Sequence, residues 1–242
     1  MAAVFPQASI IIPMDNNKYL LLQINDALFP IGGYSHSYGL ETYIQKGKIK
    51  NEADAGKYIM NYLAFNLCHN DLLGVRLAYE YGTGEDTDSL AALSNLFDVT
   101  KAPAEIRNAS IKLGSRFIKT VNNLDIKWKY DTYQTYLKKT AGANKHHALV
   151  YGLFCASADI AYKDMMEHFL YAQASGMVTN CVKTIPLSQN TGQRILFECH
   201  GIFQNVLDKV CMLTMEDFGL SVPGFDISSM QHENLYSRIY MS

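Results

Sequence analysis

The stretch that decides the fold is Asp164–Lys183, which reads DMMEHFLYAQASGMVTNCVK. Its apolar residues recur at helical spacing and small residues fill the gaps between them, so apolar atoms cover most of the helix circumference. Proline at position 186 disfavours helix in the residues before it, so the helix is predicted to end near Thr184. A helix that is apolar on nearly all sides is either wrapped by other helices or buried against a second subunit. The pattern alone leaves both arrangements open.

The composition indicates a folded protein with a sizeable core. Of its 242 residues, 48% are hydrophobic and 18% charged, which argues against disorder. The net charge of −2 gives no electrostatic reason to expect a nucleic-acid binder. The five cysteines are scattered without a Cys-x-x-Cys pair, which favours reduced thiols in a cytoplasmic protein.

No run approaches the roughly 20 apolar residues of a membrane span, and the N-terminus lacks the basic region of a signal peptide.

Helix-period patterns fill the rest of the chain, and no strand or internal repeat is predicted. We expect one all-α domain, a single-domain helical array of about ten helices, over residues 18–242, with residues 1–17 as a flexible N-terminal extension. The predicted helices cover Tyr19–Phe29, Glu52–Tyr81 with a kink near Cys68–Asn70, Thr87–Phe97, a segment after Pro103, Asp125–Ala141, His146–Tyr162 and Ser188–Leu213. Beyond these, Pro223-Gly224 is predicted to form a turn before a short amphipathic end.

Motifs of nucleotide hydrolysis, zinc proteolysis and serine hydrolysis are absent from the sequence. None of the seven histidines pairs at i,i+4 spacing, so no stable metal site is predicted. His146 and His147 are adjacent and therefore point to different faces of a helix. We interpret them as ordinary surface histidines.

Three stretches carry more glycine, hydroxyl, aromatic and basic residues than packing requires. Residues 30–41, PIGGYSHSYGLE, predict a rigid turn that begins a helix capped by Ser35 or Ser37; the alternative is a tight turn with buried tyrosines. The stretch NCVKTIPLSQNTGQ places Lys183 at a helix C-terminus, where the helix dipole by itself already favours a cation. The tail, residues 230–242, is rich in the Tyr, Met and Arg that are enriched at interfaces; alternatively it docks on its own subunit.

Together these stretches resemble the UreF family of urease accessory proteins. The likeness runs through LQINDALFPIG from Leu22 and YSHSYGLETY from Tyr34, and continues in LYAQ from Leu170, in NCVKTIPLSQNTGQ and in the tail. The segments occur in the family's order and span essentially the whole chain after residue 18. The specificity of the match comes from the combination, because no single motif carries it.

The resemblance implies a homodimeric metallochaperone scaffold and not an enzyme. Such proteins pair with the accessory subunit UreD, called UreH in some bacteria, and recruit and regulate the GTPase UreG. The assembly docks on apo-urease, where nickel is inserted next to a carbamylated lysine. The implied role includes no cofactor, and no metal bound stably by this chain, because the nickel is handled by the complex.

By matching position, the resemblance also assigns roles to single residues. Those implied at the dimer interface are Glu167, Leu170 and Tyr171. Those implied in partner binding are Tyr34, Lys183, Gln193, Tyr236 and Arg238. Among the latter, Lys183 matches the lysine linked to gating of UreG, and Gln193 falls in a segment thought to line a passage for the metal.

Two other functions remain open from the residues themselves. The first is an all-α enzyme with a Cys/His or tyrosine-lined pocket, which would need titratable groups that converge in a cavity. The second is a GTPase-regulating module unrelated to urease, which differs only in the identity of its partner.

Overall fold

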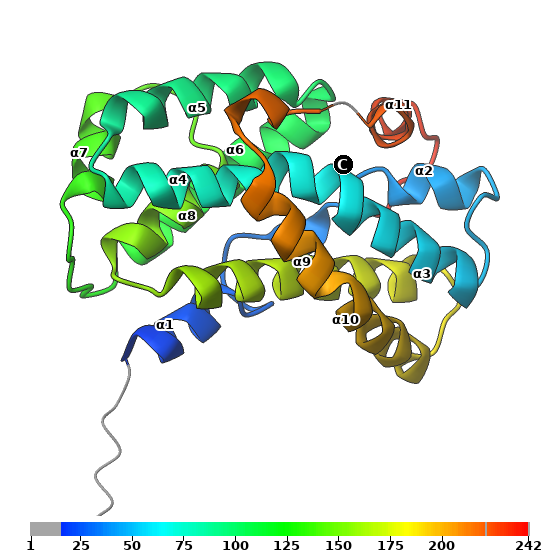
Figure 1. Ribbon diagram of the computed structural model, residues 1–242. Helices are drawn as coiled ribbons and strands as arrows, with labels where there is room; N and C mark the ends of the chain where they lie inside the picture. The colour runs from blue at the N-terminus through cyan, green and yellow to red at the C-terminus, as the bar shows by residue number, and fades with distance from the viewer. Residues whose placement is uncertain (1–15, 221, 242) are drawn as a thin grey trace, which may run out of the picture.

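The regular secondary structure of the described protein is entirely helical (Figure 1). The computed structural model describes residues 16–220 and 222–241, and these contain no strand, which confirms the all-α prediction. The elements are α1 (Asn16–Ile24), η1 (Gly33–Ser35), α2 (Leu40–Gln45), α3 (Glu52–Asn61), η2 (Tyr62–Leu72), α4 (Leu73–Thr83), α5 (Thr87–Thr100), α6 (Ala104–Val121), α7 (Thr132–Lys139), α8 (His147–Ser157), α9 (Tyr162–Thr184), α10 (Gln189–Met212), η3 (Met215–Asp217) and α11 (Pro223–His232). Most of the predicted N-terminal extension lies outside the described residues, and its last two residues open α1.

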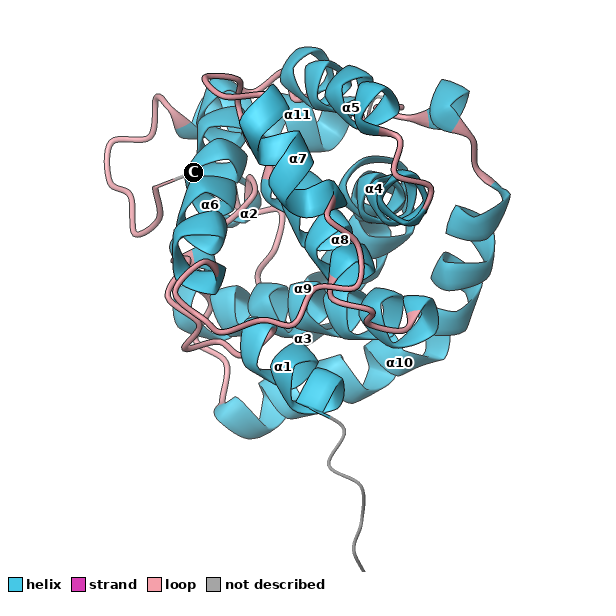
Figure 2. Ribbon diagram, turned by 90° about the vertical axis from the view of Figure 1, so that its left-hand side faces the viewer, coloured by secondary structure: helices cyan, strands magenta, loops and turns pink. Residues whose placement is uncertain are grey.

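The centre of the fold is α8, whereas the sequence pointed to α9. Every residue of α8 after His147 is buried, and α4, α6, α7 and α9 pack around it (Figure 2). A Cβ added to Gly152 would lie 2.3 Å from the carbonyl oxygen of Val75 in α4, so only glycine permits this close helix crossing. In contrast, α9 is buried on one side and exposes Tyr171, Gly176 and Thr179 on the other. The protein's own helices therefore wrap α9 only in part.

The run from Glu52 to Thr83 is helical without a break, as predicted, and comprises α3, η2 and α4. The predicted kink near Cys68–Asn70 falls within η2, which is a π-helical segment of 11 residues. π-Helical geometry is rare and occurs frequently at functional sites. From η2 the Tyr62 ring lies 5.7 Å from the Phe225 ring of α11.

Several helix boundaries differ from the prediction, among them the end of α8, which lies at Ser157 and not at Tyr162. The predicted helix Asp125–Ala141 is wrong in its first half, because residues 122–131 form a loop and α7 begins only at Thr132. In that loop the backbone N–H of Lys129 donates to the carbonyl of Ser157 at 2.8 Å, so a tertiary hydrogen bond replaces a helical one. The first helix ends at Ile24 and does not reach Phe29.

At the far end of the chain, Pro223 begins α11 and does not form the predicted turn. This position suits proline, since the first residue of a helix needs no N–H donor. Within the described residues, no helix is both long and apolar enough to cross a membrane.

Candidate functional site

The C-terminal tail, α11 and α2 lie together at one end of the molecule, opposite α7 (Figure 1). The Thr42 hydroxyl of α2 donates to the carbonyl of Ser228 in α11 at 2.8 Å. The predicted serine cap of α2 is wrong: its N-cap is Gly39, with φ at 85° and no side-chain cap. A Cβ at Gly39 would lie 2.9 Å from the Ser229 hydroxyl oxygen, so this glycine permits both the left-handed turn and the contact with α11.

A buried carboxylate holds the tail against α2. Glu41 is only 2% exposed, and its oxygens accept the backbone N–H groups of Ile239 at 2.7 Å and Tyr240 at 3.2 Å. The fully buried ring of His232 lies between two carboxylates, with Nε2 3.1 Å from Glu41 and Nδ1 2.8 Å from Glu105. A buried carboxylate is costly unless it is paired and hydrogen-bonded. The tail N–H groups thus provide hydrogen bonds that offset the cost of burying the Glu41 carboxylate.

Arg238 completes the cluster, which we call the tail latch: Glu41, Glu105, His232 and Arg238. Its Nη1 donates to Oε1 of Glu105 at 2.6 Å. The tail is fixed once more beyond the latch, where the N–H of Met241 donates to the carbonyl of Ser35 in η1 at 2.9 Å. The Arg238 side chain thus ties the tail to α6, whereas its role in partner binding stays a prediction.

The C-terminus of α9 reaches the same end of the molecule. The Asn180 side chain donates to the carbonyl of His36 at 2.8 Å, and the Tyr240 hydroxyl donates to the carbonyl of Asn180 at 3.4 Å. The Thr184 hydroxyl lies 3.5 Å from the Tyr240 hydroxyl. Next to Thr184, Lys183 is exposed in the last turn of α9, as predicted, and makes no ion pair within the described part of the chain.

The predicted partner-binding residues are therefore mostly gathered at this end. Lys183, Tyr236 and Arg238 lie in α9 and the tail, and Tyr34 belongs to η1, which contacts α9. Gln193 is exposed in the first turn of α10, beside Gly192, which packs against α9. Sequence reasoning missed Glu41, Glu105 and His232. The one available signal was Glu41 itself, an acidic residue among the aromatic and apolar residues that begin α2.

Large apolar side chains of α11, of the loop before it and of the tail face solvent. We call this set the tail surface: Leu220, Ile227, Met230, Tyr236, Ile239 and Met241. Exposed apolar side chains on an ordered backbone are typical of interaction sites. The latch and the tail surface are therefore the candidate docking site of this protein.

The residues predicted for a dimer contact are divided between the core and the surface of α9. Leu170 is fully buried within its own fold, whereas Tyr171 is 48% exposed. The Glu167 carboxylate is partly exposed and lies 3.7 Å from the Lys163 ammonium. Tyr171 and Glu167 are thus the surface members of the set.

A second exposed cluster joins α9 to α10, and we call it the aromatic patch: Tyr171, Phe197, His200 and Phe203. The His200 ring lies 6.2 Å from that of Tyr171, 5.6 Å from that of Phe197 and 5.3 Å from that of Phe203. Phe197 is 74% exposed. Tyr171 and His200 are exposed as well, whereas Phe203 is partly buried against the core. Exposed rings gathered on two helices are typical of a contact surface.

The buried thiols Cys181 and Cys199 are unreactive because they stay protonated. Burial raises the pKa of Cys181 to about 12 and that of Cys199 to about 11. The thiolate is the form that attacks and that binds metal, so both groups are inert at neutral pH. The described residues contain no group of three or more His, Cys, Asp or Glu side chains that could hold a metal ion.

His146 and His147 are interior residues, and the surface interpretation of this pair is wrong. His146 is fully buried, with Nε2 2.9 Å from Asp98 and Nδ1 3.1 Å from the Ser110 hydroxyl oxygen. Burial lowers the pKa of His147 to about 4. Sequence could not show this, because the hydrogen-bond partners of His146 come from α5 and α6.

His36, in the turn between η1 and α2, gives the fold a specific acid sensitivity. Its side chain is 4% exposed, and burial, aided by Arg116 and Lys112, lowers its pKa from 6.5 to about 4. Between these values the unfolded chain binds more protons than the folded one, so stability falls as the pH falls. At pH 5 this linkage amounts to about 2 kcal/mol.

We therefore expect a His36→Gln variant to lose about 2 kcal/mol less stability than the parent protein between pH 7 and pH 5, because glutamine takes up no proton. Urea unfolding at both pH values measures the difference. Equal losses in the two proteins would contradict the prediction.

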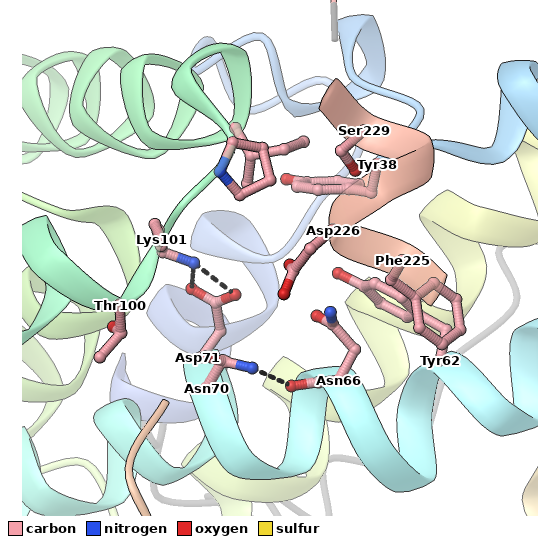
Figure 3. Close-up of a pocket in the computed structure, with 12 residues that line it drawn as sticks. Tyr38, Tyr62, Asn66, Asn70, Asp71, Thr100, Lys101, Phe225, Asp226 and Ser229 are labelled. Atoms are coloured by element: carbon pink, nitrogen blue, oxygen red, sulfur yellow. Dashed lines mark hydrogen bonds and ion pairs between the residues drawn. The ribbon is translucent and has the colours of Figure 1, made fainter. Parts of the chain in front are cut away.

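The hollows of the described structure do not fit a substrate. A pocket lined by Tyr38 and Tyr62 has a volume of about 30 Å³, whereas ligand sites usually occupy about 300–1,000 Å³. A wider groove of about 580 Å³ between α3 and α10 is lined by residues such as Glu52, Lys57 and Glu198, with no histidine, cysteine or tyrosine. The first pocket has tyrosine, aspartate and lysine side chains in its lining (Figure 3) but is too small for a substrate, and the second lacks the Cys, His or Tyr lining of the enzyme alternative.

The fold is thus a single all-helical domain with an ordered tail and exposed apolar side chains at one end. The UreF family model matches residues 49–200. A urease accessory protein UreF from Lachnoclostridium phytofermentans is 34% identical over 95% of this chain and 100% of that protein. UreF from Actinobacillus pleuropneumoniae is 32% identical over 92% of the chain and 97% of its own length, and UreF from Paenarthrobacter aurescens is 29% identical over 92% and 96%. The chain belongs to the UreF family of urease accessory proteins, which are not enzymes.

Proposed function

We propose that this chain is a homodimeric scaffold that pairs with UreD (UreH), recruits and regulates the GTPase UreG, and brings both to apo-urease for nickel insertion. Its family supports a role in urease maturation. The observation that carries the finer proposal is the tail surface, an ordered apolar platform held by the tail latch. In this proposal the protein works in the cytoplasm, residues 18–242 form the working domain, and the chain itself holds no nickel stably.

The tail surface is suited to the accessory subunit because it is already ordered. Binding a flexible tail would require the free energy of ordering it, whereas here Glu41 and Ser35 fix its backbone beforehand. Exposed aromatic and Met side chains are the residue types enriched at interface centres. This supports the tail surface as the UreD contact.

Lys183 supports the regulation of a GTPase. Its ammonium is exposed at the C-terminus of α9, where the helix dipole favours a cation, and it lies beside the residues that fix the tail. A scaffold acts only through a difference in affinity between the states of its partner. We therefore expect this protein to bind the GTP-loaded form of UreG more tightly than the GDP-loaded form.

The aromatic patch supports the homodimer. A two-fold axis through α9 and α10 would pair the patch with its own copy, which covers the exposed rings on both subunits at once. Glu167 lies one turn of helix from Tyr171, at the polar edge of this contact.

We expect Tyr171→Asp to turn the dimer into a monomer, because the change places a carboxylate in an apolar contact. Size-exclusion chromatography with light scattering measures the mass. Tyr19→Asp is the matched control, since Tyr19 of α1 is 62% exposed and lies outside the aromatic patch. A dimeric Tyr171→Asp protein, or a monomeric parent protein, would contradict the prediction.

The function as a whole is tested by deletion of the gene in a urease-positive host, followed by a nickel assay on the purified urease. We expect urease protein at normal levels with little nickel. In a second test, the pure chain is mixed with UreD and UreG, and a co-eluting complex is expected. Normal nickel content together with binding to UreG would instead support the GTPase-regulating module unrelated to urease.

A further inference from the structure

The groove between α3 and α10 lies next to the aromatic patch. Helix α10 crosses α9 at the surface of the molecule, and its N-terminal half packs against α3 (Figure 1). The groove has a volume of about 580 Å³, and Glu198 on its α10 side directly follows Phe197 of the patch. A ring that is 74% exposed and a concave surface are therefore neighbours on one helix.

The α3 side of the groove is open because a glycine lies there. Gly56 is in the interior of α3, and a Cβ added to it would meet no described atom within 4 Å. Glycine inside a helix is less favourable than alanine, and the packing of the described residues does not require it here. Ala53 and Met60, which lie on the same face of α3, also line the groove. The groove thus offers an apolar surface with free space above Gly56.

The two sides of the groove carry opposite charges that are not paired with each other. Lys57 lies on the α3 side and Glu198 on the α10 side, and neither forms a salt bridge within the described part of the chain. The nearby guanidinium of Arg194 pairs with Glu52. In a two-fold contact residue i of one copy meets residue j of the other, and j meets i. A surface that carries one free cation and one free anion is therefore complementary to its own copy.

The proposed homodimer also needs more contact area than the aromatic patch supplies. A whole aromatic side chain buries about 200 Å², so Tyr171, Phe197 and His200 together supply at most about 600 Å². A stable interface buries about 800 Å² on each partner. The contact must therefore extend beyond the patch, and the groove is the concave surface that adjoins it.

We infer that the groove between α3 and α10 receives Phe197 of a second copy of this chain, and that Lys57 of each copy pairs with Glu198 of the other. The inference rests on the homodimer of the proposed function and names the residues that make this contact specific. The two-fold relation repeats each contact, so two rings are buried and two ion pairs form together. Gly201 lies one turn beyond Phe197 and is exposed, and its missing side chain allows two α10 helices to cross closely there.

The first test measures the self-association of the full-length chain by analytical ultracentrifugation. We expect Lys57→Glu and Glu198→Lys each to weaken the dimer at least about tenfold, because each places like charges opposite one another twice. The variant that carries both substitutions should regain the affinity of the parent chain to within a few-fold. An equimolar mixture of the two single variants should form a mixed dimer, since opposite charges then meet at both positions.

Filling the groove tests the same contact without a change of charge. Gly56→Leu should keep the fold, because leucine favours helix more than glycine does and the added Cβ meets no described atom. Its side chain occupies the space intended for Phe197, so self-association should weaken at least about tenfold. Lys138→Glu in α7, an exposed cation outside the groove, is the matched control and should leave the dimer unchanged. Thermal unfolding of each variant shows whether the fold is intact.

The outcomes separate this inference from the proposed function. A monomeric parent chain would refute the homodimer itself, and the groove contact with it. If the parent is a dimer that Tyr171→Asp dissociates, whereas the folded groove variants dimerise like the parent, the inference is overturned and the proposed homodimer stands. Single charge variants that dissociate but do not recover in the mixture would also overturn it, because the two charges then do not face each other. Unchanged dimers of Gly56→Leu with weaker binding of UreD or UreG would assign the groove to that partner and likewise overturn the inference.

Discussion

Replacing Glu41 with alanine is expected to free the C-terminal tail and to abolish binding of the accessory subunit. The variant loses the acceptor of the Ile239 and Tyr240 N–H groups and one of the two carboxylates that hold His232. Removing one partner of a buried ionic cluster costs about 3–5 kcal/mol. We expect the free energy of unfolding to fall by an amount near the lower end of that range. The freed tail can expose its unpaired N–H groups to water, which lowers the cost of leaving them without a partner.

Hydrogen exchange of the tail amides measures this effect directly. The N–H groups of Ile239, Tyr240 and Met241 should exchange at the rate of an unfolded segment, while amides of α8 remain protected. Glu52→Ala is the matched control, because its carboxylate pairs with Arg194 of α10 at the surface and is not part of the latch. Protection of the tail amides in Glu41→Ala would show that the latch does not hold the tail.

The second large effect is expected from Lys183→Ala, which should fold normally and fail in urease maturation. The loss of one cation at a helix C-terminus costs at most about 1 kcal/mol, and Lys183 makes no ion pair within the described residues. If the ammonium acts on UreG, the nickel content of urease from cells with this variant should fall at least tenfold.

The appropriate control is Lys163→Ala, which removes an exposed lysine from the other end of the same helix. Its unfolding curve should resemble that of Lys183→Ala, and urease from these cells should contain its normal nickel. Normal nickel content in the Lys183→Ala cells would remove this residue from the mechanism. The latch variant and the lysine variant thus separate binding of the accessory subunit from control of the GTPase.

The predictions from sequence pattern agreed with the structure where the extent of a helix is set by residues within it or next to its ends. The long run from Glu52 is helical, and α9 ends at Thr184 as the nearby proline predicts. Ser188 caps α10, since its hydroxyl oxygen accepts the N–H of Thr191 at 3.0 Å. The prediction for residues 122–131 was wrong because the backbone there bonds to the end of α8.

The sequence by itself determined the helical class, the family and the place of Lys183 at a helix C-terminus, because helical periodicity and short motifs depend on residues that are close together in the chain. Only the tertiary structure decided that α8 is the centre, that Leu170 is interior while Tyr171 is exposed, and that Glu41 meets His232. Those last two residues are 191 positions apart. No local pattern records such a pairing, since a buried carboxylate is tolerated only where the complete fold brings donors to it.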